Sequence, residues 1–266
     1  MAISAKDVMT LRQRTGVGMM ECKAALNDAN GDMDAAIALL RERLKGQMDE
    51  RSERAASEGA IAIARRGDAV AMIELLSETD FAARNDGFVA AAQKIADLAL
   101  AGADGEVAPT DAMKHLVDDL RITIKENISL GKGVKLSGGK AGAYLHHNRK
   151  VGAIVLAQGD FSDDLLTGLC QHVVASVPTP LAVDEAGLAP AALQEQKDKA
   201  AEEAKASGKP QQIIEKMVQG KVRKWVDEQT LLGQIYIREL DAKKPVRDYL
   251  PKGGKVVNFA RFQLGA

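Results

Sequence analysis

The first 54 residues show the spacing of hydrophobic and polar positions that is typical of three short helices. Residues 4–16 read SAKDVMTLRQRTG, in which Ser4 and Asp7 have capping-box spacing and a glycine ends the stretch. Residues 19–31 end on Asn-Gly, a left-handed terminator. Residues 32–46 repeat apolar side chains at helical spacing. We predict an N-terminal three-helix module with its linker over residues 1–54, and its small core requires a larger neighbour.

The pattern then changes from helical spacing to extended runs. The charged stretch over residues 47–59 fits either a helix or a linker. Residues 59–76 form two extended runs around Arg66-Gly67-Asp68, which is a hairpin signal. Helical spacing returns over residues 85–102, where Asn85 is the predicted cap, and over residues 110–131.

A second stretch repeats this arrangement. Residues 142–161 have the same Gly-Ala opening, two extended runs and a final Asp-Phe, and residues 162–178 continue with helical spacing. We interpret the two hairpin-plus-helix units as an internal duplication. The expected fold class is α+β with antiparallel sheets, in a two-part core divided into residues 55–140 and residues 141–266.

A polar segment interrupts the second half. Residues 184–227 have a narrow apolar stripe and predict two helices joined at Ser207-Gly208-Lys209-Pro210. Such helices cannot be surrounded by core, so we expect an inserted helical hairpin, a coiled-coil arm that projects into solvent. The alternating stretches over residues 233–240 and 255–265 predict two strands that return to the second half's sheet.

Composition and charge narrow the function. The 46% hydrophobic content allows a sizeable core, and the net charge of −1 argues against nucleic acid as the main ligand. Cys22 and Cys170 lack ligand spacing and are expected to be reduced and buried. The N-terminus does not resemble a signal peptide, and the apolar runs are too short for a membrane span. We therefore expect a soluble, cytoplasmic protein without a membrane or direct nucleic-acid partner.

Asp80 and Phe81 stand where a loop is expected, and the chain has only five Phe. Large aromatic side chains are usually buried, so one interpretation places Phe81 in the core and uses Asp80 as a helix cap. Asp160-Phe161 at the matching place of the second half supports that structural explanation. The alternative is an exposed ring beside a carboxylate, which suits a partner's pocket. Asn85 favours this alternative, because it already caps the helix.

The other candidate residues point to contacts rather than to chemistry. His146 and His147 are adjacent in an extended run, so we expect them on opposite faces, without a shared metal. Helical spacing predicts that one of Met19 and Met20 is buried and that the other is free for a partner. The glycines before them lack the ending of a phosphate loop. Without a nucleophile–base pair or nucleotide fingerprint, we expect a non-enzymatic protein with no catalytic residue, metal or cofactor.

Three stretches together carry a family resemblance. LRQRTGVGMMECKAAL, ETDFAARNDGF and GKPQQIIEKMVQGKVRKW, in this order, resemble bacterial translation elongation factor Ts, and the closing FARFQLG is similar to the family's last strand. The resemblance runs from about Val8 to Gly265. Two positions depart from the family's pattern: Glu78, where Gln is common, and Ala82, where Val is common.

The resemblance implies a guanine-nucleotide exchange factor for the GTPase elongation factor Tu, in its GDP-bound and nucleotide-free forms. It also implies that the N-terminal module is like ubiquitin-associated domains. Matching by position assigns three sets of contact residues. The segment that disturbs the GTPase's magnesium site matches Thr79, Asp80, Phe81 and Ala82; the module face matches Arg12, Met19 and Met20; the second-half contact matches His146 or His147.

This assignment gives Phe81 a hypothetical role. A GTPase holds GDP partly through Mg²⁺ and phosphate-binding backbone groups, so a ring inserted between its helices would shift the elements that position Mg²⁺. Two rival hypotheses stay open: a ubiquitin-associated-like binding module without exchange activity, and an enzyme with an uncommon site at His146 and His147. The sequence leaves open a 1:1 or 2:2 complex, the contacts of the arm and the orientation of the N-terminal module.

Overall fold

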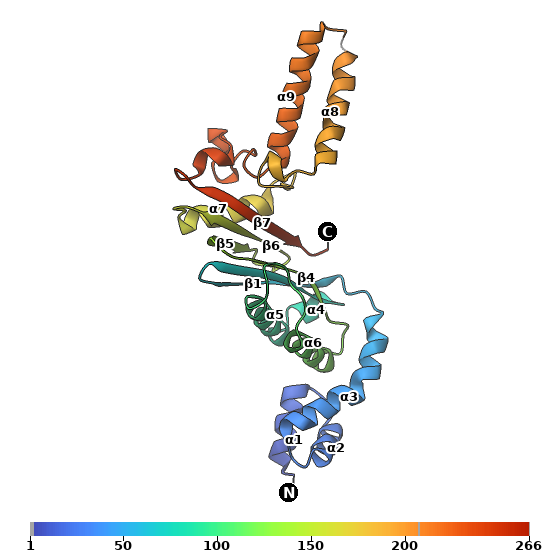
Figure 1. The fold of residues 1–266 in the computed structure, drawn as a ribbon. Helices are drawn as coiled ribbons and strands as arrows, with labels where there is room; N and C mark the ends of the chain where they lie inside the picture. The colour runs from blue at the N-terminus through green and yellow to red at the C-terminus, as the bar shows by residue number, and fades with distance from the viewer. Residues whose placement is uncertain (1–2, 207, 266) are drawn as a thin grey trace.

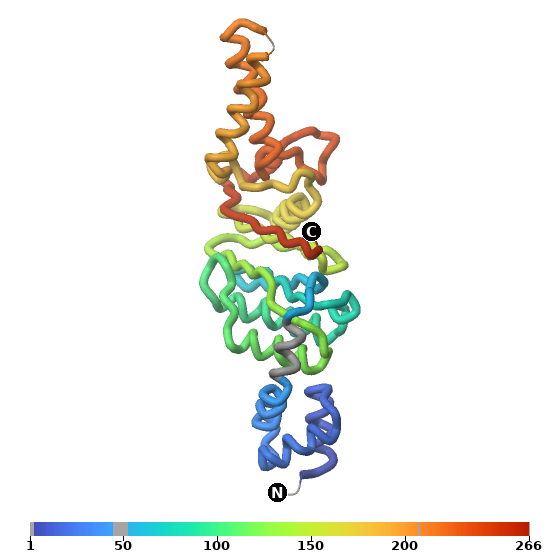
Figure 2. Tube along the Cα trace, turned by 90° about the vertical axis from the view of Figure 1, so that its right-hand side faces the viewer, coloured from blue at the N-terminus to red at the C-terminus, as the bar shows by residue number. Residues whose placement is uncertain are grey.

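The computed structural model describes residues 3–206 and 208–265, with the backbone alone over residues 45–52. Ser207, in the predicted junction of the arm, lies outside the described residues. The molecule is elongated: a helical module lies at one end, a pair of long helices at the other, and sheets with covering helices lie between them (Figure 1). The view turned by 90° shows the same rod-like outline (Figure 2).

The N-terminal module contains α1 (Ala5–Thr15), α2 (Met19–Asp28) and α3 (Met33–Ser52). The predicted capping box is confirmed, because Asp7 N–H donates to Ser4 Oγ and Ser4 N–H donates to Asp7 Oδ2, both at 3.1 Å. Gly16 ends α1 with φ +66°. Helix α3 runs on to Ser52, so the charged stretch after the module is helical only in its first part, residues 47–52.

The first sheet has the strand order β1-β2-β4-β3 and is antiparallel. The predicted hairpin is confirmed: β1 (Glu58–Arg66) and β2 (Ala69–Ser77) pair throughout and turn at Gly67-Asp68. Helices α5 (Asp86–Ala99) and α6 (Asp111–Ile124) cover one face of this sheet (Figure 1). Asn85 caps α5, because its Oδ1 accepts from the N–H groups of Gly87 and Phe88.

The prediction of one helix over residues 110–131 is wrong at its C-terminal end. Helix α6 ends at Ile124, and Lys125 takes a left-handed conformation with φ +64°. Residues 129–136 form β4 instead, and β3 (Gly105–Glu106) pairs with its far edge. Strand β4 satisfies the second edge of β2, which explains why tertiary pairing overrides the helical spacing here.

The second sheet has the order β5-β6-β7, formed by β5 (Lys140–Leu145), β6 (Val151–Gln158) and β7 (Lys255–Gln263). Helix α7 (Asp163–Ala175) covers its outer face, so the hairpin-plus-helix unit occurs in both halves. The two sheets pack face to face through apolar side chains that include Ile61, Met72 and Ile154. The core is therefore layered as helices, sheet, sheet and helix.

The predicted strand over residues 233–240 is wrong, whereas the last strand is confirmed as β7. Residues 237–242 form the 3-10 helix η2, and Ile235 makes only an isolated bridge with Pro245. Tyr236 explains the difference: its side chain is buried in the α7 core, and its N–H donates to Lys244 O at 3.0 Å. The short helices η1 (Glu185–Gly187) and η3 (Val246–Tyr249) flank the arm and η2.

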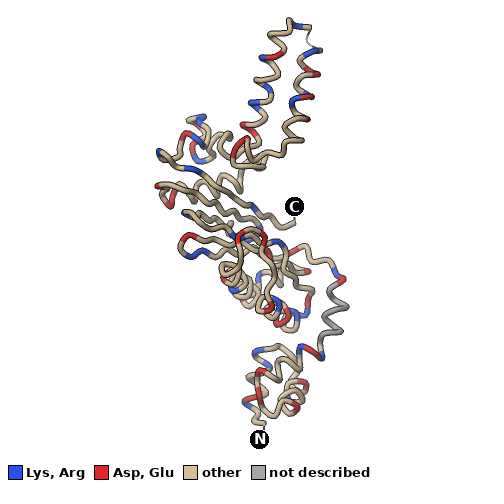
Figure 3. Tube along the Cα trace, in the orientation of Figure 1, with Lys and Arg blue, Asp and Glu red and all other residues tan. Residues whose placement is uncertain are grey.

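The arm consists of α8 (Pro190–Lys205) and α9 (Gln211–Gln229), with Pro210 as the N-cap of α9. Ala200 and Ala204 are buried between the helices, and Lys221 pairs with Glu203 across them. The prediction of a projecting hairpin is confirmed (Figure 1). Both signs of charge are interspersed along it (Figure 3). No helix in the part of the chain that the structure describes is long and apolar enough to cross a membrane.

Candidate protein-binding site

Phe81 lies in α4 (Asp80–Ala83), a single helical turn between β2 and α5. The ring is 81% exposed, so the interpretation that placed it in the core is wrong. Ala82 and Ala83 face inward and are buried against the first half. The helix therefore rests on two small side chains and holds a large aromatic ring in solvent.

The matching residue of the second half has the opposite environment. Phe161 is 1% exposed and belongs to the core beneath α7. A Cβ added at Gly254 would come within 2.9 Å of its ring, so the loop before β7 covers it closely. The internal duplication therefore does not explain Phe81, because burial is satisfied in one half only.

Thr79 fixes the start of α4. Its Oγ1 accepts from Ala82 N–H at 3.2 Å, as an N-cap does. Its N–H and hydroxyl both donate to the Glu126 carboxylate, at 3.1 and 2.7 Å. Its carbonyl accepts from Ser77 Oγ at 2.9 Å. Each polar group of Thr79 thus has a partner, and the turn that carries Phe81 has a defined geometry.

Asp80 faces the second half. Its carboxylate pairs with Arg84 at 2.9 Å, but Arg84 is well exposed and Asp80 is partly exposed, so this pair contributes little stability and is free to exchange partners. Asp80 lines a hollow of about 460 Å³ together with Arg84, His147 and Arg149. The structure thus brings the predicted Asp80-Phe81 pair beside the turn that joins β5 and β6.

The two histidines do not lie on opposite faces of a strand. They lie in the turn after β5, and their ring centroids are 4.2 Å apart. His146 is half-buried, with Nδ1 3.1 Å from the Tyr144 hydroxyl, and His147 is exposed. Arg149 O accepts from Ile61 N–H at 2.8 Å, which fixes the turn to β1. Among the described residues, no three His, Cys, Asp or Glu side chains are grouped to hold a metal ion.

The N-terminal module exposes both methionines, so the prediction that one is buried is wrong. Met19 is 50% exposed and Met20 is 77% exposed. Val17 and Cys22 take the inward positions around the start of α2, which leaves no inward position for either methionine. Arg12 is also exposed, on α1. These three predicted residues therefore lie on the module's surface.

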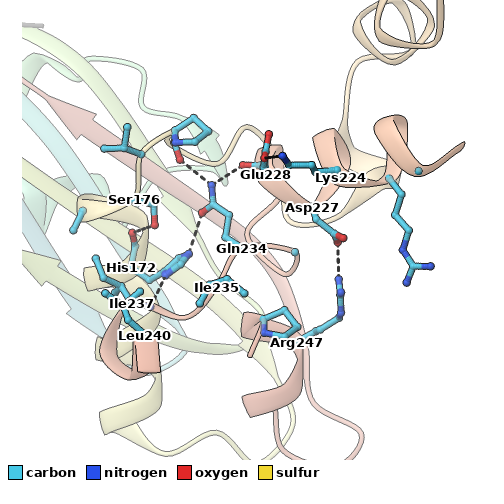
Figure 4. A pocket seen from close by; sticks show the side chains of 17 residues that line it. His172, Ser176, Lys224, Asp227, Glu228, Gln234, Ile235, Ile237, Leu240 and Arg247 are labelled. Atoms are coloured by element: carbon cyan, nitrogen blue, oxygen red, sulfur yellow. Dashed lines mark hydrogen bonds and ion pairs between the residues drawn. The ribbon is translucent and has the colours of Figure 1, made fainter. Parts of the chain in front are cut away.

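The sequence did not reveal a hollow of about 710 Å³ at the base of the arm, between α7, α9 and η2 (Figure 4). Val177, Ile235 and Leu240 line it and are exposed. His172 and Gln234 form its polar floor, with His172 Nε2 3.0 Å from Gln234 Oε1. The wrong prediction of a strand over residues 233–240 explains why this site was missed. In a strand, the alternating side chains of these residues would pack on a sheet instead of lining a hollow.

Exposed apolar side chains on well-fixed backbone are typical of the class of proteins that bind another protein. The family model described as Elongation factor TS matches residues 78–266. Elongation factor Ts of Thioalkalivibrio sulfidiphilus (strain HL-EbGR7) is 38% identical over 278 residues, which cover 100% of this chain and 93% of the relative. The Psychrobacter sp. (strain PRwf-1) protein of the same name is 37% identical, and the match covers 99% of this chain and 91% of the relative. The chain belongs to the elongation factor Ts family and is a translation elongation factor.

Proposed function

We propose that this chain is a guanine-nucleotide exchange factor for elongation factor Tu. It binds the GDP-bound GTPase, promotes GDP release and stays bound until GTP enters, in the cytoplasm. Family membership supports the class of activity. The observation that carries the mechanism is the 81% exposure of Phe81 on a helix whose N-terminal end is held by two hydrogen bonds from Thr79 to Glu126. Its counterpart Phe161 is buried.

Phe81 acts as the wedge. Burial of an exposed Phe ring is worth about 2–3 kcal/mol, and each 1.4 kcal/mol changes an equilibrium tenfold. Because α4 is already ordered, little of this free energy is lost in fixing the ring on binding. Inserted between helices of the GTPase, the ring shifts the elements that position Mg²⁺. Asp80, whose Arg84 pair is exposed, perturbs the charge at that site.

The exchange requires no covalent step. If the factor weakens GDP binding, GDP weakens the factor's binding by the same ratio, because coupling free energies are reciprocal. GTP therefore displaces the factor in the last step. This makes the protein a non-enzymatic exchange factor that needs no cofactor of its own.

The remaining contacts hold the complex. Met19, Met20 and Arg12 dock the N-terminal module on the nucleotide domain, and the soft methionine side chains adapt to that surface. His147, exposed beside Asp80, makes the second-half contact, whereas His146 is occupied by Tyr144. Ala82 anchors α4 from below. A 1:1 complex suffices for these contacts, and a 2:2 complex would need a further interface.

The test is the release of fluorescent GDP from elongation factor Tu. We expect Phe81→Ala to lower the saturating release rate at least tenfold while affinity for the nucleotide-free GTPase changes less. Leu181→Ala is the matched control, because Leu181 is also apolar and 66% exposed but lies outside the site. If Phe81→Ala loses affinity and rate in proportion, the wedge mechanism is wrong.

The exposed methionines also fit the rival function, a ubiquitin-associated-like module that binds without exchange. GDP release by the wild-type protein separates the two, and Met20→Asp tests the module's contact under either function. An exchange factor loses affinity and needs a higher concentration for half-maximal release. A simple binding module loses its partner as well, but the wild-type protein then never accelerates GDP release.

A further inference from the structure

The C-terminal turn of α6 lies between the N-terminal module and α4. On the module side, Ile122 is buried in the module's own core. The Thr123 hydroxyl donates to Thr15 O at 3.3 Å, and a Cβ added at Gly16 would come within 3.2 Å of Thr123 Cα. The end of α6 is therefore in close contact with the module.

The next residues contact the wedge segment. Glu126 accepts both hydrogen bonds from Thr79, and the Asn127 N–H donates to Glu78 Oε1 at 2.6 Å. Glu78 also lies 3.5 Å from an Arg54 guanidinium nitrogen. Residues 122–127 thus join the module to the segment that precedes Phe81.

We propose that Glu126 is a positioning residue for nucleotide exchange: it fixes the N-terminal end of α4 and so sets the direction in which Phe81 points. It acts through Thr79. The inference rests on the proposed function, because it concerns how the same wedge is held.

The length of α4 makes this support necessary. Four residues form one turn, and an isolated turn is unstable because nucleation costs more than its few hydrogen bonds return. The inward side chains of α4, Ala82 and Ala83, bury too little surface to fix its orientation alone. Glu126 supplies two charge-assisted hydrogen bonds to a single residue, which fixes both the backbone and the cap side chain of Thr79.

Two measured quantities separate the positioning of Phe81 from the docking of the factor on the GTPase. The saturating rate of GDP release reports on positioning, and the half-saturating concentration reports on docking. We expect Glu126→Ala in the full chain to lower the saturating rate of fluorescent GDP release about five- to tenfold. The half-saturating concentration should stay within about twofold, because Met19, Met20 and His147 are unchanged. Thr79→Val should behave in the same way, and Thr79→Ser, which keeps the hydroxyl, should retain the rate.

Coupling between the two residues gives a second test. Because Glu126 acts through Thr79, the double variant should be no more than about twofold slower than the slower single variant. Asp111→Ala is the control, since Asp111 is an exposed acid at the other end of α6. Independent effects that multiply would overturn the proposal, as would a raised half-saturating concentration at an unchanged saturating rate.

Amide hydrogen exchange of the free protein tests the structural step without the GTPase. Glu126→Ala should speed exchange at Ala82 to Arg84 and leave α5 protected. Unchanged protection of α4 would overturn the positioning role. If α4 loses protection as expected but neither the wild type nor any variant accelerates GDP release, the proposed function is wrong. In that case the result still supports the structural part of the inference, that Glu126 holds α4 in place.

Discussion

Phe81 and Phe161 show what a single residue's context decides. Both follow an aspartate after the second strand of a hairpin, so the local sequence alone predicts the same degree of burial for both. Phe161 is covered by the loop around Gly254, a segment almost a hundred residues further along the chain. No described side chain covers Phe81 to this degree, and its ring stays 81% exposed. The sequence therefore locates both aromatics, but only the fold distinguishes core from contact.

His172 carries a prediction about pH. The imidazole is 1% exposed; its Nδ1 accepts from Ile237 N–H at 3.2 Å, so Nε2 holds the proton and donates to Gln234. Burial lowers the pKa of His172 below its usual value, and the Gln234 hydrogen bond offsets this only partly. Below about pH 6.5 the unfolded chain therefore binds more protons than the folded one, and folding stability falls.

We expect the free energy of unfolding to fall between pH 7.5 and pH 5.5, by at most about 1.4 kcal/mol per pH unit from this group. Urea unfolding at both pH values measures it. His172→Gln is the control, because it keeps a donor toward Gln234 and does not titrate. The variant should be less stable at pH 7.5 and should lose this part of the pH dependence. An equal fall in both proteins would exclude His172 as the cause.

At the scale of elements, capping and turn chemistry made the helices and hairpins of the core predictable. Ser4, Asn85 and Gly67 each mark a boundary that the structure confirms. The failures occur where the chain gives no such signal. Helix α6 stops at a lysine in the left-handed region, and the strand that follows contains two glycines, at positions 131 and 133. Its pairing with β2 could not be inferred, because that contact is distant in sequence.

The same lysine supports an element-scale prediction. A left-handed conformation costs a residue with a Cβ about 1 kcal/mol relative to glycine. Lys125→Gly should therefore raise the free energy of unfolding by about 0.5–1 kcal/mol, measured as a higher urea midpoint with an unchanged slope. Lys114→Gly, earlier in α6, is the matched control and should destabilise by about 1 kcal/mol. If both variants destabilise, strain at the end of α6 is not released by glycine.

At the scale of the whole molecule, the parts were predictable and their junctions were not. The spacing of Met113, Val117 and Leu120 marks the face of α6 that packs on the first half. Ile122 lies off that face, and its burial has no explanation within α6 alone. The structure explains this burial, because Ile122 completes the core of the N-terminal module. An ion pair between Arg41 of the module and Asp119 of α6, at 2.5 Å, adds a second contact. The orientation of the module thus depends on contacts that hydrophobic spacing does not encode.

This division of α6 leads to a prediction about which parts of the molecule unfold together. Ile122→Ala should remove about 2–4 kcal/mol from the contact between the module and the core. Amide hydrogen exchange should then rise in α1 and α2, while α5 and β2 stay protected, because the first half keeps its own apolar cluster. Leu120→Ala, two residues away on the same helix, should have the opposite pattern: amide hydrogen exchange should rise in α5 first, before it rises in α1 and α2. If both variants raise exchange throughout the chain, the module and the core unfold as one unit, and α6 transmits every disturbance from the module to the wedge.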